Sequence, residues 1–296
     1  MQIKNEIEGW LIIDKPLNMG STQVVSRLKH LLHPTKIGHA GTLDPLATGV
    51  LPIAFGKATK TIPYVMEGKK EYLFDVTFGT QTDTDDLAGK VIQSSDVIPS
   101  KEQIEQILPE FTGSIWQRPP AYCALKIAGK RAYDLARNGQ NPELKERQIQ
   151  IDACQLQAFQ GNTASFYVKC SKGTYVRSLG RDIALKLGTV GHISKLRRIS
   201  CLPFSLKDTF LLENLEKMEY NQILSRLTAL STALSDISVL AVDADQARAL
   251  CQGKSLPAMG DYPDLVRAVF NDKTIALLER KEGVWHPFRV LVNTLE

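Results

Sequence analysis

Features that mark secreted, membrane-spanning or zinc-binding proteins are missing from this chain of 296 residues. Its five cysteines lie at least 16 residues apart, so no Cys-x-x-Cys pair of a zinc ribbon or redox site occurs. No apolar run approaches the roughly 20 residues that span a bilayer, and the polar N-terminus lacks the pattern of a signal peptide. We expect a cytoplasmic protein with reduced thiols, built as one large domain and a small one.

Cofactor motifs are also missing. Gly56-Lys57 is followed by Ala58 where a phosphate loop needs Ser or Thr, and Gly-x-Gly-x-x-Gly does not occur. Three histidines, His30, His33 and His39, lie near one another but have no Cys or Glu at metal-ligand spacing. The sequence therefore predicts a reaction that side chains carry out without a cofactor or metal.

Basic residues are unevenly distributed along the chain. The formal net charge is +4, the sum of +7 over residues 1–205 and −3 over residues 206–296. Basic residues gather in 118–137 and in 169–198, where eight of them accompany a single acid. Such clusters suit a polyphosphate partner, although an ordinary solvated surface would look the same.

The most informative segment runs from Gly38 to Pro52 and places Asp44 in a loop of small residues. A carboxylate in such a loop can act as a nucleophile or acid–base group if a nearby group keeps it ionised. Asp followed by Pro is also a common helix N-cap, which needs no catalytic explanation. Residue spacing leaves both interpretations open.

Hydrophobic periodicity predicts alternating helices and strands. Helical spacing covers 21–32, with Ser21 or Thr22 as its cap, and then 101–111, 174–188 with Thr174 as its cap, 221–234 and 243–253. Strand patterns cover 9–14, 72–78, 166–170, 265–270, 274–279 and 284–292. The strands near the C-terminus predict a small β-rich module that begins near residue 240.

Several motifs occur in a fixed order along residues 9–205. They are Asp14-Lys15-Pro16, the 38–52 loop, Gly56-Lys-Ala-Thr-Lys60, Lys-Glu-Tyr72, Gly79 to Gly89, Pro119 to Lys126, Ser171-Lys-Gly-Thr-Tyr-Val-Arg177 and Leu196-Arg-Arg198. Together they resemble the TruB family of tRNA pseudouridine synthases, which isomerise uridine 55 in the T arm. Cys123 departs from the family pattern, which usually has serine there.

The resemblance implies an α+β fold, with a mixed, mostly antiparallel sheet of the pseudouridine synthase type and flanking helices. The catalytic domain would occupy 1–235, with a basic RNA-binding insertion at about 118–147. A β-rich module resembling PUA domains would occupy 240–296. The net −3 of the tail is unusual for an RNA-binding module.

The resemblance also implies catalytic roles for three residues. Asp44 would be the nucleophile, and Arg177 would pair with it and favour its ionised form. Tyr72 would stack on the flipped uracil, and its hydroxyl would help remove the C5 proton. Without the family match, Arg177 is an ordinary phosphate contact and Tyr72 a packing residue.

Other positions match family residues around the base and the RNA. Tyr175 and Leu196 would line the base pocket, although Leu196 could equally be a core residue with exposed arginine neighbours. His39 would fill the space that the flipped base leaves. Lys15 would support the catalytic loop from beneath and belongs with the substrate-binding set. Phosphate contacts are expected from Lys60, Lys126, Lys130, Arg131 and Arg137.

The resulting prediction is a cofactor-free isomerase that acts as a monomer on the T stem-loop of tRNA. One rival is an RNA-binding or chaperone protein without catalysis, for which a carboxylate facing phosphates has no use. Another is a guide-RNA-dependent pseudouridine synthase subunit, which would need partner-docking extensions. The sequence leaves open whether the intermediate is a covalent adduct or a glycal.

Overall fold

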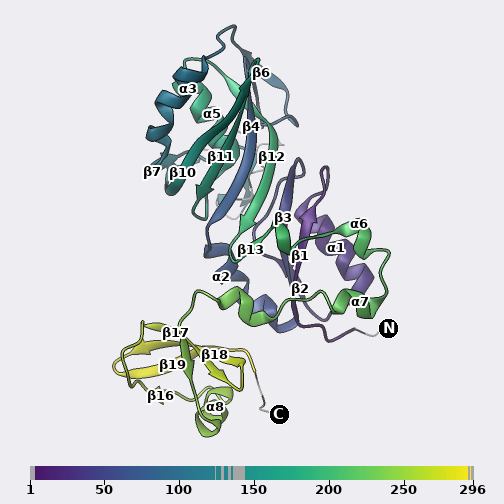
Figure 1. Cartoon of the computed structure of the whole chain (residues 1–296), viewed down its shortest axis with the longest axis vertical. Helices are drawn as coiled ribbons and strands as arrows, with labels where there is room; N and C mark the ends of the chain where they lie inside the picture. Colours follow the sequence, from purple (N-terminus) through teal and green to yellow (C-terminus); the bar gives the residue numbers. More distant parts are fainter. Residues whose placement is uncertain are drawn as a thin grey trace.

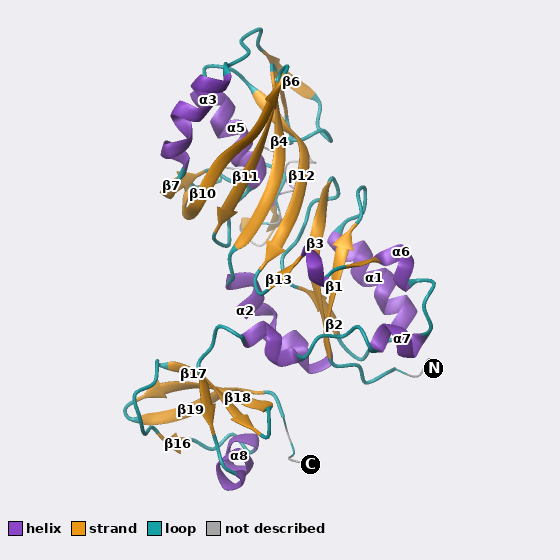
Figure 2. Cartoon of the chain, viewed as in Figure 1, coloured by secondary structure: helices purple, strands orange, loops and turns teal. Residues whose placement is uncertain are grey.

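The computed structural model describes residues 4–292 and 294, apart from 124, 128–129, 133–134 and 136–143; for 126–127 and 130–131 it describes the backbone. A ten-stranded sheet and a separate five-stranded sheet organise these residues (Figures 1 and 2). The main path of the large sheet is β14 (Phe210–Leu211), β1 (Gly9–Lys15), β3 (Ala47–Phe55), β12 (Gly191–Cys201), β4 (Lys70–Phe78), β11 (Thr163–Cys170), β10 (Arg147–Gln160) and β7 (Gly113–Gln117). Strands β2 (Ile37–His39) and β13 (Phe204–Ser205) pair with β3 and β12.

Neighbouring strands of this sheet are mostly antiparallel. The pairs β1–β14 and β3–β12 are parallel. With helices packed on the sheet, this arrangement confirms the predicted α+β fold with a mixed, mostly antiparallel sheet. None of the described helices is long and apolar enough to cross a membrane.

The middle of the sheet brings distant motifs together. Strand β12 pairs in parallel with β3 and antiparallel with β4, so Arg198 lies opposite both Gly49 and Tyr72. Gly49 has φ 101, and a Cβ there would lie 2.1 Å from the Arg198 carbonyl oxygen. Only glycine permits this close approach, which places the loop before β3 beside the other two strands.

Helix α1 (Ser21–Leu32) packs against the part of the sheet formed by β1 and β3. Val24, Leu28 and Leu32 recur at helical spacing and are fully buried, as the sequence pattern predicted. The predicted cap is wrong, because Gly20 occupies the N-cap position and Gln23 accepts its backbone N–H. The Ser21 hydroxyl is used elsewhere, in the loop before Asp44.

Helix α5 (Val176–Lys186) covers the other part of the sheet and buries Leu179 and Ile183 against β4 and β12. Its N-cap is Tyr175, whereas Thr174, the predicted cap, donates to the Ser171 carbonyl. The predicted 101–111 helix is α3 (Lys101–Ile107), which continues as a 3₁₀ turn to Phe111. Helix α2 (Ile62–Glu67) leads into β4.

The predicted helix over 221–234 is wrong. The segment is divided between the short helix α7 (Tyr220–Leu224) and a 3₁₀ helix over Leu230–Leu234, and α6 (Leu212–Leu215) precedes it. Between the last two, the Thr228 N–H donates to the Trp10 carbonyl and the Trp10 N–H donates to the Thr228 carbonyl. This bridge to β1 requires extended backbone and interrupts the helical pattern.

The five-stranded sheet near the C-terminus matches the predicted β-rich module. Its order is β15 (Val239–Ala241), β17 (Leu265–Phe270), β18 (Lys273–Lys281), β19 (Val284–Val290) and β16 (Leu256–Pro257), with α8 (Ala244–Cys251) packed against it. Leu277 and Leu291 of this module pack with Leu234 and Tyr64. The module therefore packs against the rest of the chain through a small apolar contact.

Candidate active site

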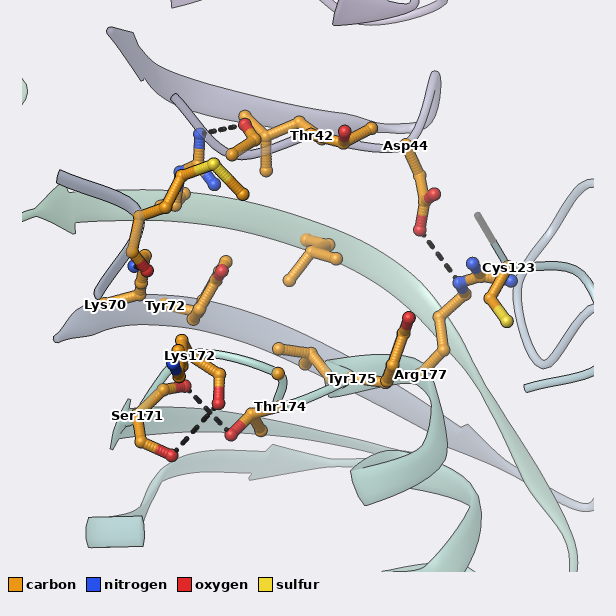
Figure 3. A pocket seen from close by; sticks show the side chains of 17 residues that line it. Thr42, Asp44, Lys70, Tyr72, Cys123, Ser171, Lys172, Thr174, Tyr175 and Arg177 are labelled. Atoms are coloured by element: carbon orange, nitrogen blue, oxygen red, sulfur yellow. Dashed lines mark hydrogen bonds and ion pairs between the residues drawn. The ribbon is translucent and has the colours of Figure 1, made fainter. Parts of the chain in front are cut away.

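A pocket of about 280 Å³ opens between the loop that precedes β3, strands β4 and β12, and the start of α5 (Figure 3). It is lined by Gly41, Thr42, Leu43, Asp44, Met66, Lys70, Tyr72, Cys123, Ser171, Lys172, Gly173, Thr174, Tyr175, Val176, Arg177, Leu196 and Arg198. Five residues that the sequence placed at the site, Asp44, Tyr72, Tyr175, Arg177 and Leu196, share this lining. Their meeting in one cavity makes the pocket the candidate active site.

Asp44 and Arg177 form an ion pair in this pocket. Arg177 Nε lies 2.8 Å from Asp44 Oδ2, and the side-chain exposures are 7% and 39%. Nη1 of the same guanidinium donates to the Thr84 carbonyl at 3.0 Å, and Nη2 donates to the Tyr122 carbonyl at 2.8 Å. The arginine is thus held rigidly from three sides while the carboxylate stays accessible from the pocket.

A second carboxylate lies behind the pair. Asp86 Oδ2 is 3.8 Å from Arg177 Nε, and Asp86 Oδ1 accepts hydrogen bonds from the Thr84 hydroxyl and the Ala88 N–H. The loop that contains Thr84 and Asp86, within the Gly79 to Gly89 motif, therefore supports Arg177 by charge and by a backbone carbonyl. Asp86 itself has 11% side-chain exposure, which leaves Asp44 as the carboxylate that faces solvent.

Tyr72 lines the pocket opposite the Asp44 loop and contacts Arg198. Burial raises the pKa of Tyr72 to about 12, although the hydrogen-bonded Arg198 guanidinium opposes the shift. Arg198 is 1% exposed and donates to the carbonyls of Val50 and Gly41. The alternative in which Leu196 has exposed arginine neighbours is therefore wrong for Arg198; Arg197 forms a bidentate pair with Asp14.

Tyr175 and Leu196 supply the aromatic and apolar walls. Burial raises the pKa of Tyr175 to about 12, and its hydroxyl is hydrogen-bonded to the Cys123 thiol. The Gln117 side chain contacts the Tyr175 backbone. A pocket with such walls excludes water and suits a flat, uncharged ring.

Lys15 supports the Asp44 loop from within the protein. Its fully buried side chain donates to the carbonyls of Pro16, Met19 and Pro45, the last at 3.3 Å. Burial lowers its pKa to about 8, with Asp44 opposing the shift and Arg198 adding to it. The predicted support is present, but a side chain this buried reaches a substrate only through the loop that it holds.

His39 and Lys60 lie outside the pocket lining. His39 ends β2, and burial followed by Arg198 lowers its pKa, so the ring is neutral at pH 7. Its Nδ1 is buried and has no hydrogen-bond partner among the described residues. Lys60 donates to the Val290 carbonyl at 2.8 Å and thereby contacts the C-terminal module.

The predicted basic insertion is described only in part. Lys126 lies on β8 (Lys126–Ile127), and Lys130 and Arg131 form β9 (Lys130–Arg131), which pairs with β8. Their side chains, and the whole of Arg137, lie outside the described residues. Phosphate contacts from this insertion stay a prediction.

Sequence reasoning missed three supporting side chains. Ser21 holds the backbone of Leu43, Arg198 holds Tyr72 and Gly41, and Lys70 donates to carbonyls at the end of α2, including Val65 and Gly68. The burial of Arg198 and Lys70 could not be predicted, because both lie in segments rich in basic residues, which are usually exposed. Within the described residues, no group of His, Cys, Asp and Glu has the geometry to hold a metal.

Comparison with known proteins shows the family to which the chain is similar. Residues 29–176 match the description "TruB family pseudouridylate synthase (N terminal domain)", and residues 177–237 match "tRNA pseudouridylate synthase B C-terminal domain". A tRNA pseudouridine synthase B from Gluconacetobacter diazotrophicus is 46% identical over 96% of this chain and 97% of its own length. Another from Agrobacterium fabrum is 47% identical over 96% of this chain and 94% of its own.

A solved structure is similar to this protein over nearly the whole chain. A chain in the crystal structure of a Cbf5-Nop10-Gar1 complex superimposes with a TM-score of 0.75 at 26% identity, covering 96% of this chain and 85% of that one. The fold, the pocket and two matched domains lead to one conclusion. The chain belongs to the TruB family of pseudouridylate synthases.

Proposed function

We propose that this protein converts uridine 55 in the T arm of tRNA to pseudouridine, without a cofactor or metal. The observation that carries the proposal is the Asp44–Arg177 ion pair at 2.8 Å inside a pocket with aromatic and apolar walls. The tRNA pseudouridine synthases B at 46–47% identity support the choice of substrate. The T-arm position rests on the family resemblance.

The reaction breaks the C1′–N1 bond, rotates the uracil and joins C5 to C1′; C5 loses its proton and N1 gains one. The target base must first leave its stack, which costs a few kcal/mol. Asp44, as nucleophile, would attack the ribose or the base, or assist formation of a glycal. Arg177 pairs with that carboxylate at 2.8 Å and fixes its position at the pocket.

Tyr72 stacks on the flipped uracil in this proposal. Because its pKa is raised to about 12, the free protein holds the phenol form at neutral pH. For this oxygen to remove the C5 proton, the phenol must first lose its own proton to solvent; the Arg198 guanidinium would stabilise the resulting phenolate, which then takes up the proton from C5. Tyr175 and Leu196 form the remaining walls around the base.

The rest of the chain would bind RNA. We assign the catalytic domain to 1–235, with the basic insertion at about 118–147, and a PUA-like module to 240–296. Lys60, Lys126, Lys130 and Arg131 would contact phosphates, and His39 would occupy the space left by the everted base. The protein would work as a monomer in the cytoplasm.

Tritium release tests the proposal. Purified protein is incubated with a T-arm transcript tritiated at uracil C5, and tritium released to water is measured with and without chelator. We expect release from one uridine, unaffected by chelator. Asp44→Asn should abolish release while RNA binding stays within a few-fold of wild type, and Asp96→Asn, at an exposed position that does not line the pocket, is the matched control.

Other outcomes would favour the rival functions. RNA binding without release by the wild type indicates a binding or chaperone protein. Release that appears only after addition of a guide RNA indicates a guided synthase subunit. Full activity of Asp44→Asn would show that the nucleophile is a different group.

A further inference from the structure

We propose that Gln117 is a positioning residue for the isomerisation, fixing the Tyr175 backbone and, through it, the Arg177 guanidinium. Gln117 does not line the pocket and does not reach the reacting atoms. The inference rests on the proposed function, because the rate of that reaction is its main readout.

The contact is a two-point clamp. Gln117 ends β7 and is 2% exposed. Its Oε1 accepts a hydrogen bond from the Tyr175 N–H at 2.8 Å, and its Nε2 donates to the Tyr175 carbonyl at 3.1 Å. A planar amide that binds both polar groups of one residue fixes its orientation as well as its distance.

The clamp acts where α5 begins. Tyr175 is the N-cap residue, and its own side chain makes no capping hydrogen bond. Its carbonyl also accepts the Leu179 N–H at 3.0 Å, so the Gln117 amide is tied directly to the first turn. Arg177 stands two residues further on, and a shift of this turn moves its Nε relative to Asp44.

Backbone contacts extend the same connection past Gln117. The Arg118 carbonyl accepts hydrogen bonds from the Ser178 hydroxyl at 2.8 Å and from Arg181 Nη2 at 3.0 Å. The Tyr122 carbonyl accepts Arg177 Nη2. Residues 117–122 thus run along the first turns of α5. Arg118 and Tyr122 contact the helix through their backbone carbonyls, whereas Gln117 binds the Tyr175 N–H and carbonyl through its side chain.

A matched substitution isolates the clamp. Gln117→Met keeps the length and volume of the side chain but removes both hydrogen bonds to Tyr175. With enzyme in excess over tritiated T-arm RNA, we expect the single-turnover rate to fall about 10²-fold, the effect of misplacing a catalytic group by about 1 Å. The Kd for the same RNA should stay within a few-fold, because Gln117 is 2% exposed and does not line the pocket.

Two further variants separate positioning from stability. Ile149→Ala removes buried packing from β10, opposite Ile115, without touching Tyr175. Its melting temperature should fall at least as far as that of Gln117→Met while its single-turnover rate stays near wild type. Gln117→Glu keeps the acceptor for the Tyr175 N–H, so its rate should lie between those of wild type and Gln117→Met.

Three results would overturn the inference: an unchanged rate in Gln117→Met, a loss of rate that follows the loss of RNA binding, or an equal loss in Ile149→Ala. A wild type that releases no tritium would instead overturn the proposed function, and the inference with it. An active wild type with an unaffected Gln117→Met leaves the proposed function standing and removes only the clamp.

Discussion

The Ser21 hydroxyl holds Leu43, the residue before Asp44, by both of its backbone groups. It accepts the Leu43 N–H at 2.8 Å and donates to the Leu43 carbonyl at 3.0 Å. Lys15 binds the Pro45 carbonyl on the other side of Asp44. The loop that carries the carboxylate is therefore fixed immediately before and immediately after it.

Ser21→Ala should lower both stability and turnover. Ser21 is 3% exposed, so the change leaves two buried backbone groups without partners, at a cost of about 1–3 kcal/mol in the free energy of unfolding. Urea unfolding and tritium release measure the two effects. Ser26→Ala, at an exposed position on the same helix, should change neither. Normal turnover in Ser21→Ala would mean that the loop keeps its position without this hydroxyl.

Much of this fold follows from local pattern. The apolar spacing of α1, the alternation of β4 and the strands of the C-terminal module were predicted from sequence, because each pattern reports one buried face. The Thr228–Trp10 bridge could not be predicted, since the contact joins residues far apart in the chain. Helical spacing over 221–234 was therefore misleading.

The candidate site was predicted in its chemistry but only partly in its support: the contact from Lys15 was expected, whereas those from Ser21, Lys70 and Arg198 were not. Asp44, Tyr72 and Arg177 stand in motifs that resemble those of the TruB family, and their expected roles follow from that resemblance. Arg198 stands in a basic run that predicts exposure, yet β12 lies in the middle of the sheet and buries it. Pairing of β12 with both β3 and β4 decides this burial, and pairing depends on the whole topology.

Arg177→Lys should slow the reaction with little change in RNA affinity. Lysine keeps the charge but cannot hold Asp44, Thr84 and Tyr122 together as the planar guanidinium does. We expect a loss of about 10²-fold in single-turnover rate, from misplacement of the carboxylate. Arg248→Lys, exposed on the C-terminal module, should behave as wild type. A rate within a few-fold of wild type would show that charge suffices.

Lys15 should make stability depend on pH above neutrality. Its pKa falls from 10.5 to about 8 on folding, so between these values the unfolded chain holds the proton that the folded protein has lost. Stability from this group therefore increases with pH across that window, by at most about 1.4 kcal/mol per pH unit. Urea unfolding of wild type and Lys15→Met should show the difference growing in favour of wild type from pH 8 to 10. A constant difference would contradict the lowered pKa.

The C-terminal module should bind RNA through Arg289, although residues 206–296 carry a net charge of −3. Burial lowers the pKa of Lys60, and the neighbouring cations Lys57, Arg289 and Lys36 lower it further, against the opposing charge of Glu8. Cations gathered with so little compensating charge repel one another, and a phosphate backbone would relieve that repulsion.

Arg289→Ala should weaken T-arm tRNA binding at low salt and reduce the slope of log K against log salt by about 1, measured by filter binding. Arg248→Ala removes a cation of the same module that is paired with Asp245, and it should leave the slope unchanged. Equal slopes for Arg289→Ala and wild type would show that Arg289 makes no phosphate contact. The affinity for RNA phosphates would then come from the first 235 residues.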